Sequence, residues 1–326
     1  MTPIHTSALM AFGLATSAVL TTAPVMAQST YPNQPIRIVV PNPPGGLPDV
    51  LSRIIADKLK DKLGQSVVVE NRPGANAGIG AAAVTASKPD GYTFLMSDSA
   101  IITISHHLNA ELPFNAKDLM PVTLVGRAPI FLGASTKLPA ATLKELADYV
   151  KANPGKVTYG SSGVGSFHHL SMEALQTDLG LKLNHIPYKG SGESVTALRG
   201  GHIDLVFAAY AGLSPAVKAN QARFIAVNSL KRSDQAPDVP AIAETIPGFD
   251  LAVTQSLYAR TGTPAEIVNR VAAEIAIVVK DPDVVQKFAA AGIEPVGAGP
   301  QELAKVLEGE SERVVKIVKA AGLKPN

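Results

Sequence analysis

The sequence has no cysteine and no tryptophan, and aromatic residues make up only 5% of its 326 residues. Without cysteine the chain can form no disulfide, no thiolate nucleophile and no cysteine-ligated metal site. So few aromatic side chains do not make a platform on which nucleic-acid bases could stack. Lys plus Arg number 29 and Asp plus Glu number 27, so no strong basic field is present either. We therefore predict that nucleic acid is not a partner.

The chain also lacks an apolar run long enough to cross a bilayer, which takes roughly 20 residues. Its longest apolar stretch, residues 8–20, has the length of a signal-peptide core, and Val25 and Ala27 suit cleavage before Gln28. The alternative, a membrane anchor, is disfavoured by that length. His5 is the only potentially basic side chain ahead of the core, which is atypical. We predict that residues 1–27 are a signal peptide and that the mature protein is exported to the periplasm.

Short β-rich runs alternate with helical patterns along the rest of the chain. After the first run, apolar residues from Leu51 to Leu63 keep helical spacing. Such alternation predicts an α/β fold in which mostly parallel sheets are flanked by helices. Two sheets are favoured over one, with chain crossings at residues 127–130 and 247–251. The predicted strands are residues 36–40, 67–70, 92–96, 157–160, 185–188 and 203–207.

Several helix boundaries can also be predicted from the sequence. Residues 142–145 (TLKE) and 263–266 (TPAE) have the pattern of capping boxes at helix starts. Gly155 and Gly180 are placed as helix ends.

Three loops stand where a predicted strand turns into a helix: residues 41–49 (PNPPGGLPD), 161–166 (SSGVGS) and 189–192 (KGSG). In α/β sheets, ligands bind beyond the carboxyl ends of the strands. A helix start presents free N–H groups and the positive end of the helix dipole, so it binds anions without a charged side chain. Each loop alone is weak evidence, but three at the same topological position predict a site for a small anionic solute.

The three loops contribute different groups. Gly45 and Gly46 let the backbone approach a ligand, and the neighbouring prolines stiffen the turn. Asp49 falls in the first helical turn, where it either caps N–H groups or contacts the ligand. The second loop adds serine hydroxyls, and Lys189 is the one cation in the three loops.

Enzymatic alternatives have weaker support. None of the loops matches a P-loop, a dinucleotide-binding loop or a serine nucleophile elbow. Ser166 stands close to His169, which leaves a serine esterase as an alternative, although neighbouring residues at a helix start point apart. The pairs 106–107 and 168–169 are histidines, but adjacent histidines diverge on a helix and rarely chelate together. We predict no enzymatic activity, no cofactor and no metal.

Long segments, in order, resemble the extracytoplasmic solute receptors of the tripartite tricarboxylate transporter family, the Bug proteins. They include YPNQPIRIVVPNPPGGLPD, LGQSVVVENRPGANAGIGA, YVKANPGKVTYGSSGVGSFHHL, HIPYKGSG and LRGGHIDLVF. The resemblance covers nearly the whole mature chain. It implies a two-lobed periplasmic binding protein of type II with the ligand cleft between the lobes. Lobe 1 would comprise residues 28–127 and 251–326, and lobe 2 residues 128–250.

The same resemblance implies a ligand and a partner. The ligand would be a small carboxylate (a dicarboxylate, tricarboxylate, aromatic carboxylate or amino acid), delivered by a monomeric receptor to membrane permease subunits. A receptor that presents its ligand to a membrane sensor is the alternative. The residues predicted to bind the ligand are Asn42, Pro44, Gly45, Gly46, Asp49, Ser97, Ser161, Gly163, Gly165, Ser166, His169, Tyr188, Gly190 and Ser191.

The sequence departs from the family pattern at four positions. Asn42 stands where an aromatic residue is usual, and Thr254 lies near the place of a frequent tryptophan. Arg260 replaces a common proline, and Ala197 replaces a frequent acidic residue. These positions lie near the expected pocket or hinge, so they bear on which solute is bound rather than on the class of protein.

Overall fold

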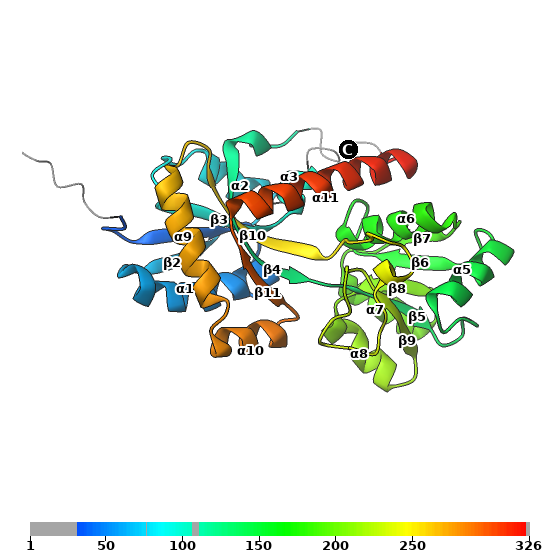
Figure 1. The fold of residues 1–326 in the computed structure, drawn as a ribbon. Helices are drawn as coiled ribbons and strands as arrows, with labels where there is room; N and C mark the ends of the chain where they lie inside the picture. The colour runs from blue at the N-terminus through cyan, green and yellow to red at the C-terminus, as the bar shows by residue number, and fades with distance from the viewer. Residues whose placement is uncertain (1–30, 76, 106–110, 324–326) are drawn as a thin grey trace, which may run out of the picture. The chain divides into compact units, whose positions relative to one another are not determined.

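The computed structural model describes residues 31–75, 77–105 and 111–323. The predicted signal peptide, its cleavage point before Gln28 and the pair His106–His107 lie outside the described residues. The described chain forms two β-sheets with helices packed on both faces of each (Figure 1). The predicted α/β fold with two sheets is confirmed.

The first sheet has the strand order β11-β4-β10-β3-β1-β2. β1 pairs in parallel with β2 and β3, whereas β10 and β11 run against the other strands. Its strands are β1 (Ile36–Val40), β2 (Val67–Asn71), β3 (Thr93–Asp98), β4 (Leu119–Ala128), β10 (Val253–Arg260) and β11 (Glu294–Ala298).

Alternation along β1 decides which helices cover each face of the first sheet. Ile36, Ile38 and Val40 point into one apolar cluster, and Val39 points into the other. The first cluster is completed by α1 (Leu47–Leu63), α9 (Ala265–Val278) and α10 (Pro282–Ala290). The second is completed by α2 (Gly78–Thr85), α3 (Ala100–Thr103) and the first half of α11 (Pro300–Ala320).

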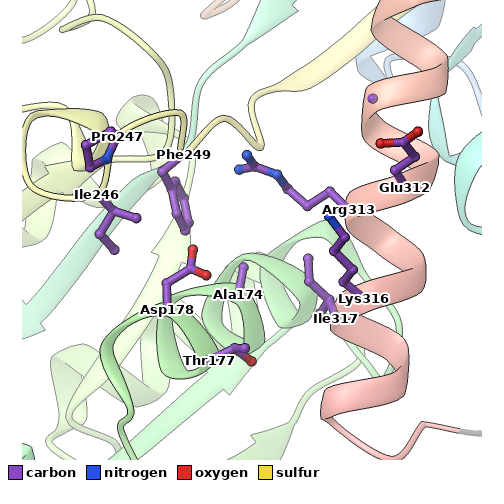
Figure 2. Close-up of a pocket in the computed structure, with 11 residues that line it drawn as sticks. Ala174, Thr177, Asp178, Ile246, Pro247, Phe249, Glu312, Arg313, Lys316 and Ile317 are labelled. Carbon is purple, nitrogen blue, oxygen red and sulfur yellow. The ribbon is translucent and has the colours of Figure 1, made fainter.

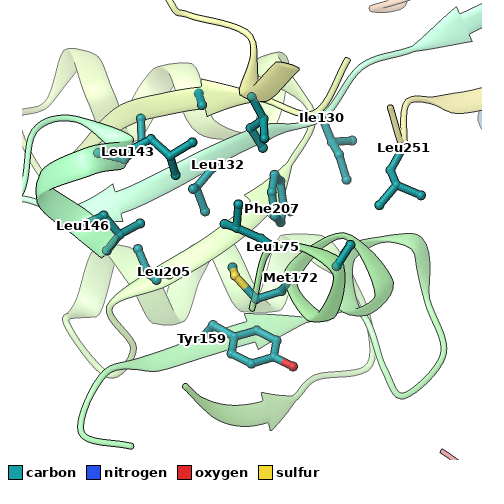
Figure 3. Packing of buried hydrophobic residues seen from close by; sticks show 14 of the residues in the cluster. Ile130, Leu132, Leu143, Leu146, Tyr159, Met172, Leu175, Leu205, Phe207 and Leu251 are labelled. Carbon is teal, nitrogen blue, oxygen red and sulfur yellow. The ribbon is translucent and has the colours of Figure 1, made fainter. Parts of the chain in front are cut away.

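The second sheet has the order β7-β6-β8-β5-β9, and only β5 runs against its neighbours. Its strands are β5 (Phe131–Ser135), β6 (Thr158–Ser161), β7 (Asn184–Pro187), β8 (Leu205–Ala208) and β9 (Ala222–Val227). Figure 3 shows the cluster formed on one face with α5 (Leu143–Ala152) and α6 (Phe167–Leu179). The other face is covered by α7 (Ser191–Gly200) and α8 (Tyr210–Lys218). Two short 3-10 helices, η1 (Ala116–Asp118) and η2 (Ile242–Glu244), complete the elements.

The two sheets repeat one topology. β2-β1-β3-β10-β4 in the first sheet corresponds in order and direction to β7-β6-β8-β5-β9 in the second. In each sheet the first strand of the parallel set, β1 or β6, lies between the next two strands of that set. The chain therefore moves to one side of the first strand and then crosses back to its other side. Such switch points leave a crevice at the carboxyl ends of the strands. The loops after β1 and β6, residues 41–46 and 162–166, therefore lie at equivalent switch points.

Two chain segments link the sheets. β4 ends at Ala128 and β5 begins at Phe131, and the return segment reaches the first sheet again at β10. Asn228 ties the two segments together, because its side chain accepts the N–H of Ile130 at 2.8 Å and donates to the carbonyl of Leu251 at 2.6 Å. The residue ranges of the two lobes remain a prediction.

Helix α11 contacts both halves of the described chain: β4 and α3 on the side of the first sheet, and α6 on the side of the second sheet (Figure 1). Leu303 and Leu307, in its first half, belong to a core cluster of the first sheet. Val314 and Ile317, in its second half, belong to a core cluster of the second sheet. The last helix of the chain thus contributes apolar surface to both halves of the molecule.

The predicted helix boundaries are partly confirmed. Thr142 caps α5 by accepting the N–H of Glu145 at 3.2 Å, while the Glu145 carboxylate accepts the preceding N–H of Ala141. The second capping box is wrong. α9 has Pro264 as its N-cap without a side-chain hydrogen bond, because the Thr263 hydroxyl instead donates to the carbonyl of Arg260 and closes the turn after β10.

The two predicted helix ends also differ. Gly180 is the left-handed C-cap of α6, as predicted. Gly155 is not a cap, because α5 already ends at Ala152 with Asn153 as its C-cap, and Gly155 lies in the following turn. Within the described ranges, no helix combines the length and the apolar character that crossing a membrane requires.

Candidate ligand-binding site

The loop between β1 and α1 is shaped by one glycine rather than two. Gly45 has φ +84°, which side-chain-bearing residues rarely adopt. Gly46, the N-cap of α1, has φ −68° and ψ 159°, so it lies in the ordinary extended region. Only Gly45 therefore depends on glycine's conformational freedom.

The Asp49 carboxylate braces this loop from inside. It accepts the N–H of Gly45 at 2.9 Å and hydrogen bonds from Arg53 and Asn71, and it is 3% exposed. Burial alone would raise the pKa of Asp49, but the hydrogen bonds from Arg53, Gly45 and Asn71 outweigh it and lower that pKa. Asn71 also donates to the carbonyl of Asn42 at 3.0 Å. Asp49 therefore binds an N–H of the loop ahead of the N-cap rather than an N–H of α1, which has no side-chain cap hydrogen bond, and its contact with the ligand stays a prediction.

The start of α1 offers unpaired N–H groups. The N–H of Gly46 donates to Pro43, and that of Gly45 to Asp49. In the part of the chain that the structure describes, the N–H groups of Leu47 and Asp49 have no recorded hydrogen-bond partner. Pro44 and Gly45 are exposed beside them. This helix start can therefore donate to an anion through the backbone.

The loop between β6 and α6 is built around its serines and glycines. Gly163 and Gly165 have φ +116° and +78°. Ser161 is fully buried, and its hydroxyl oxygen accepts the N–H of Gly163 at 3.1 Å. Ser166 is the N-cap of α6: it accepts the N–H of His169 at 3.2 Å and donates to the carbonyl of Gly163 at 2.8 Å. The serine hydroxyls predicted to contact the ligand therefore also form the hydrogen bonds that stabilise the loop.

Three histidines from outside this loop bond to it. The contacts are His185 Nε2 to Ser161 Oγ at 2.7 Å, His168 Nδ1 to Ser162 Oγ at 2.7 Å, and the N–H of Gly165 to His169 Nδ1 at 3.0 Å. Burial lowers the pKa of all three histidines to about 4, so they are neutral at neutral pH. Because His169 accepts through Nδ1, its neutral ring carries the proton on Nε2.

Two of these histidines form part of a stack of rings in which Tyr159 and His169 are buried and His185 is partly buried. The ring of His185 lies between His169, with centroids 4.1 Å apart, and Tyr159, with centroids 4.7 Å apart. Glu173 of α6 accepts from the Tyr159 hydroxyl and from Gln176, and lies 3.7 Å from Nε2 of His169. Burial, followed by the nearby Glu173, raises the pKa of Tyr159. The stack fixes His169 and His185 and, through them, the loop.

The esterase pair is not assembled in this geometry. The Ser166 hydroxyl binds the backbone, and the His169 ring binds Gly165, so no nucleophile–base contact joins Ser166 to that imidazole. His168 and His169 also point to different partners, as adjacent helical residues should. Among the described residues, no cluster of three or more potential metal ligands occurs.

The third loop continues the same edge of the second sheet. The N–H of Tyr188 donates to the carbonyl of Ser161 at 3.1 Å, so the ends of β6 and β7 are joined there. Gly190 is the N-cap of α7 without a side-chain hydrogen bond. Across the described chain, no partner is recorded for the N–H groups of Ser191 or Gly192. Lys189 is exposed.

The structure gathers the predicted residues into two groups, one at the edge of each sheet. Loop 161–166 and residues 188–191 adjoin one another on the second sheet. Loop 41–49 lies on the first sheet, where Ser97 is the last residue but one of the parallel neighbour β3. Ser97 is 2% exposed and lies opposite Ser256 of β10 in the strand register. The sequence reasoning missed Asn71 and His185, which brace the two loops. Each is a polar residue on a strand that pairs in parallel with the strand preceding the loop, and this is the signal that could have identified them.

Paired sheets of equal topology, joined by two crossings and with helix starts at both switch points, define a periplasmic binding protein fold. Solved structures agree. The chain is similar to an R. palustris protein solved with adipate (32% identity, TM-score 0.75, 91% of this chain and 100% of that one). It is also similar to the periplasmic binding protein BugD (30%, 0.70, 91% and 100%) and to MatC from Rhodopseudomonas palustris with bound malate (27%, 0.69, 88% and 100%).

Residues 51–323 match the model of the tripartite tricarboxylate transporter family receptor, and the chain belongs to this family. Among its relatives is the protein BugT of Bordetella pertussis, 37% identical over 305 residues that cover 93% of each chain. A relative from Agrobacterium vitis is 35% identical over 315 residues, covering 94% of this chain and 91% of the other. The predicted resemblance is confirmed. Members of this family are solute-binding receptors rather than enzymes.

Proposed function

We propose that this receptor captures a small carboxylate between the loops of its two sheets and delivers it to a membrane permease. The observation that carries the proposal is the set of unpaired N–H groups at the starts of α1 and α7, at the carboxyl ends of β1 and β7. Those groups can hold a carboxylate by backbone donors and helix dipoles. Two similar proteins were solved with carboxylates, adipate and malate.

The two sheets would contribute different parts of the site. Residues Asn42, Pro44, Gly45 and Gly46 would present one loop, and Ser97 a neighbouring hydroxyl, from the first sheet. The second sheet would contribute the loop 161–166 with Tyr188 and Ser191. His169 would act mainly through the N–H of Gly165 that it holds. The lobes would comprise residues 28–127 with 251–326, and 128–250.

The remaining features of the proposal concern the cell and the assembly. The mature protein would begin at Gln28 after removal of residues 1–27 in the periplasm, and it would act as a monomer. Mass spectrometry of the periplasmic protein tests the cleavage point, and light scattering tests the monomer.

A thermal-shift screen of adipate, malate, citrate, benzoate and glutamate tests the central claim, because a ligand that binds only the native state raises the melting temperature. Calorimetric titration of each positive compound should give one carboxylate per chain. Chromatography of the released compound should recover it unchanged. If no carboxylate in the set shifts the melting temperature, or if a transformed product is released, the proposal is wrong.

A further inference from the structure

A cavity of about 400 Å³ lies between α6, α11 and the return segment 246–249. None of the residues predicted to bind the carboxylate lines it. Its volume falls in the range of small-molecule sites. Figure 2 shows the side chains around it. The lining residues are Ala174, Thr177, Asp178, Ile246, Pro247, Phe249, Gly309, Glu312, Arg313, Lys316 and Ile317.

The apolar part of the wall belongs to the buried core. Phe249, Ile317 and Ala174 are 1%, 4% and 3% exposed and belong to the core cluster of the second sheet. The guanidinium of Arg313 lies 5.8 Å from the centroid of the Phe249 ring and donates to the carbonyl of Gly248. This wall is therefore already ordered, which lowers the entropic cost of binding.

The polar part of the wall carries balanced charge. Asp178 and Glu312 are acidic, and Arg313 and Lys316 are basic. None of the ion pairs recorded in the described ranges involves any of these four side chains. Both signs of charge are thus available to a ligand. The two carboxylates of a dicarboxylate would lie near the like charges of Asp178 and Glu312. A ligand with one charge of each sign keeps the net charge of the site at zero.

We propose that this cavity is a second binding site, for a small zwitterion with an ammonium, a carboxylate and an apolar body, such as an apolar amino acid. The ammonium would pair with Asp178 or Glu312, and the carboxylate with Lys316 or Arg313. The apolar body would pack against Phe249 and its neighbours. Because α11 contacts α6 beside the cavity and β4 of the first sheet, a ligand here strengthens the contact between α11 and α6.

The test uses the mature full-length protein with isoleucine methyl labels and L-phenylalanine as the probe. Ile246 and Ile317 line the cavity. Ile79, 49% exposed and hydrogen-bonded to Gly74, and Ile38 in the core of the first sheet serve as internal references. Saturable NMR shifts of Ile246 and Ile317 are expected. 3-Phenylpropanoate, without the ammonium, and 2-phenylethylamine, without the carboxylate, should bind at least about tenfold more weakly, equivalent to about 1.4 kcal/mol.

Gly309 provides a matched pair of variants, because a Cβ built there meets no atom within 4 Å. Gly309→Leu should fill part of the cavity and abolish the probe's shifts, whereas Gly309→Ala should retain them. Asp178→Asn should weaken binding of L-phenylalanine but not of 3-phenylpropanoate. The inference is overturned if Ile246 and Ile317 do not shift at about 10 mM probe. It is also overturned if their shifts persist in a folded Gly309→Leu variant, or if the analogues bind as well as the zwitterion.

Discussion

Arg127 and Asp250 join the two segments that link the sheets, by a two-pronged ion pair with N–O distances of 2.8 and 2.7 Å. Arg127 belongs to β4 just before the chain leaves the first sheet, and Asp250 lies on the return segment before β10. Their side chains are 21% and 20% exposed. Asn228 holds the same two segments through Ile130 and Leu251. The ion pair and the two hydrogen bonds of Asn228 thus set the spacing of the two crossings.

Breaking this pair should destabilise the protein. Arg127→Ala and Asp250→Ala should each cost about 1–3 kcal/mol of unfolding free energy, since each leaves a partly buried charge without its partner. The double variant should cost less than the sum of the two. Urea unfolding of all three measures the coupling. Arg232→Ala, in the exposed pair Arg232–Glu244, is the matched control and should have a much smaller effect. Additive losses would show that the pair contributes nothing as a pair.

Gly45 and Gly46 should respond differently to the same substitution. Gly45→Ala should lower the unfolding free energy by about 1–2 kcal/mol, because alanine is strained at φ +84°. It should also weaken carboxylate binding by displacing the exposed N–H groups. Gly46→Ala places a methyl 3.3 Å from the carbonyl of Pro43 at an ordinary φ, so its cost should be smaller. Denaturation and calorimetry on both variants decide this, and equal effects would contradict the role given to Gly45.

Variants at Ser166 and Lys189 distinguish binding of the carboxylate by backbone N–H groups from binding by a salt bridge. Ser166→Ala removes the N-cap of α6 and should cost about 1 kcal/mol of stability. It should also weaken binding by loosening loop 161–166. Lys189→Ala removes an exposed cation and should change the affinity for the carboxylate only modestly. Calorimetric titration compares the two. Loss of binding in Lys189→Ala, with Ser166→Ala unaffected, would replace the backbone mechanism with a direct ion pair.

The sequence was sufficient for elements whose signal is local. The runs at β1 and β6 and the cap at Thr142 could be predicted because strand propensity and capping chemistry act between near neighbours. The prediction at Thr263 was wrong because its hydroxyl could either accept the N–H of Glu266 or donate to the carbonyl of Arg260, and the turn after β10 favours the second bond.

The bracing of the site could not be predicted in the same way. Asn71 reaches Asn42 and Asp49 only because β2 pairs with β1 in one register, and His185 reaches Ser161 because β7 pairs with β6. Register between distant strands depends on the whole sheet rather than on any short sequence pattern. The contribution of α11 to both cores is hidden for the same reason, since its apolar face reads as one continuous stripe.

The histidines beneath loop 161–166 should make stability depend on pH. In the folded chain their pKa values are about 4, below the usual 6.5. Between pH 4 and pH 6.5 the unfolded chain therefore binds more protons than the folded chain. Stability should therefore fall as pH is lowered from about 6.5 to about 4, by up to about 1.4 kcal/mol per pH unit for each histidine. His185→Gln should flatten this slope in urea unfolding series. An unchanged slope in His185→Gln would contradict the role given to its burial.

Asp98 should show the opposite dependence. Burial raises its pKa from 3.8 to about 6, although the N–H of Ala100 at 3.1 Å partly offsets the shift. The unfolded carboxyl ionises first, so this group costs stability as pH rises from about 4 to about 6, and the cost persists above that.

Asp98→Asn keeps an acceptor for Ala100 and removes the charge, so it should raise the unfolding free energy at pH 7 by about 1–3 kcal/mol. Below about pH 3, where Asp98 is protonated in both the folded and the unfolded chain, the difference from the parent protein should vanish. Urea unfolding of both proteins across this pH range measures the difference in unfolding free energy, and subtracting the two curves removes the shared contribution of the histidines.

Asp98 follows Ser97 at the end of β3, on the edge proposed to face the ligand, and residues that cost stability at such places are commonly kept for binding. Carboxylate affinity should therefore change in Asp98→Asn while stability rises. A variant that is less stable at pH 7 would contradict the assignment of a destabilising charge to Asp98.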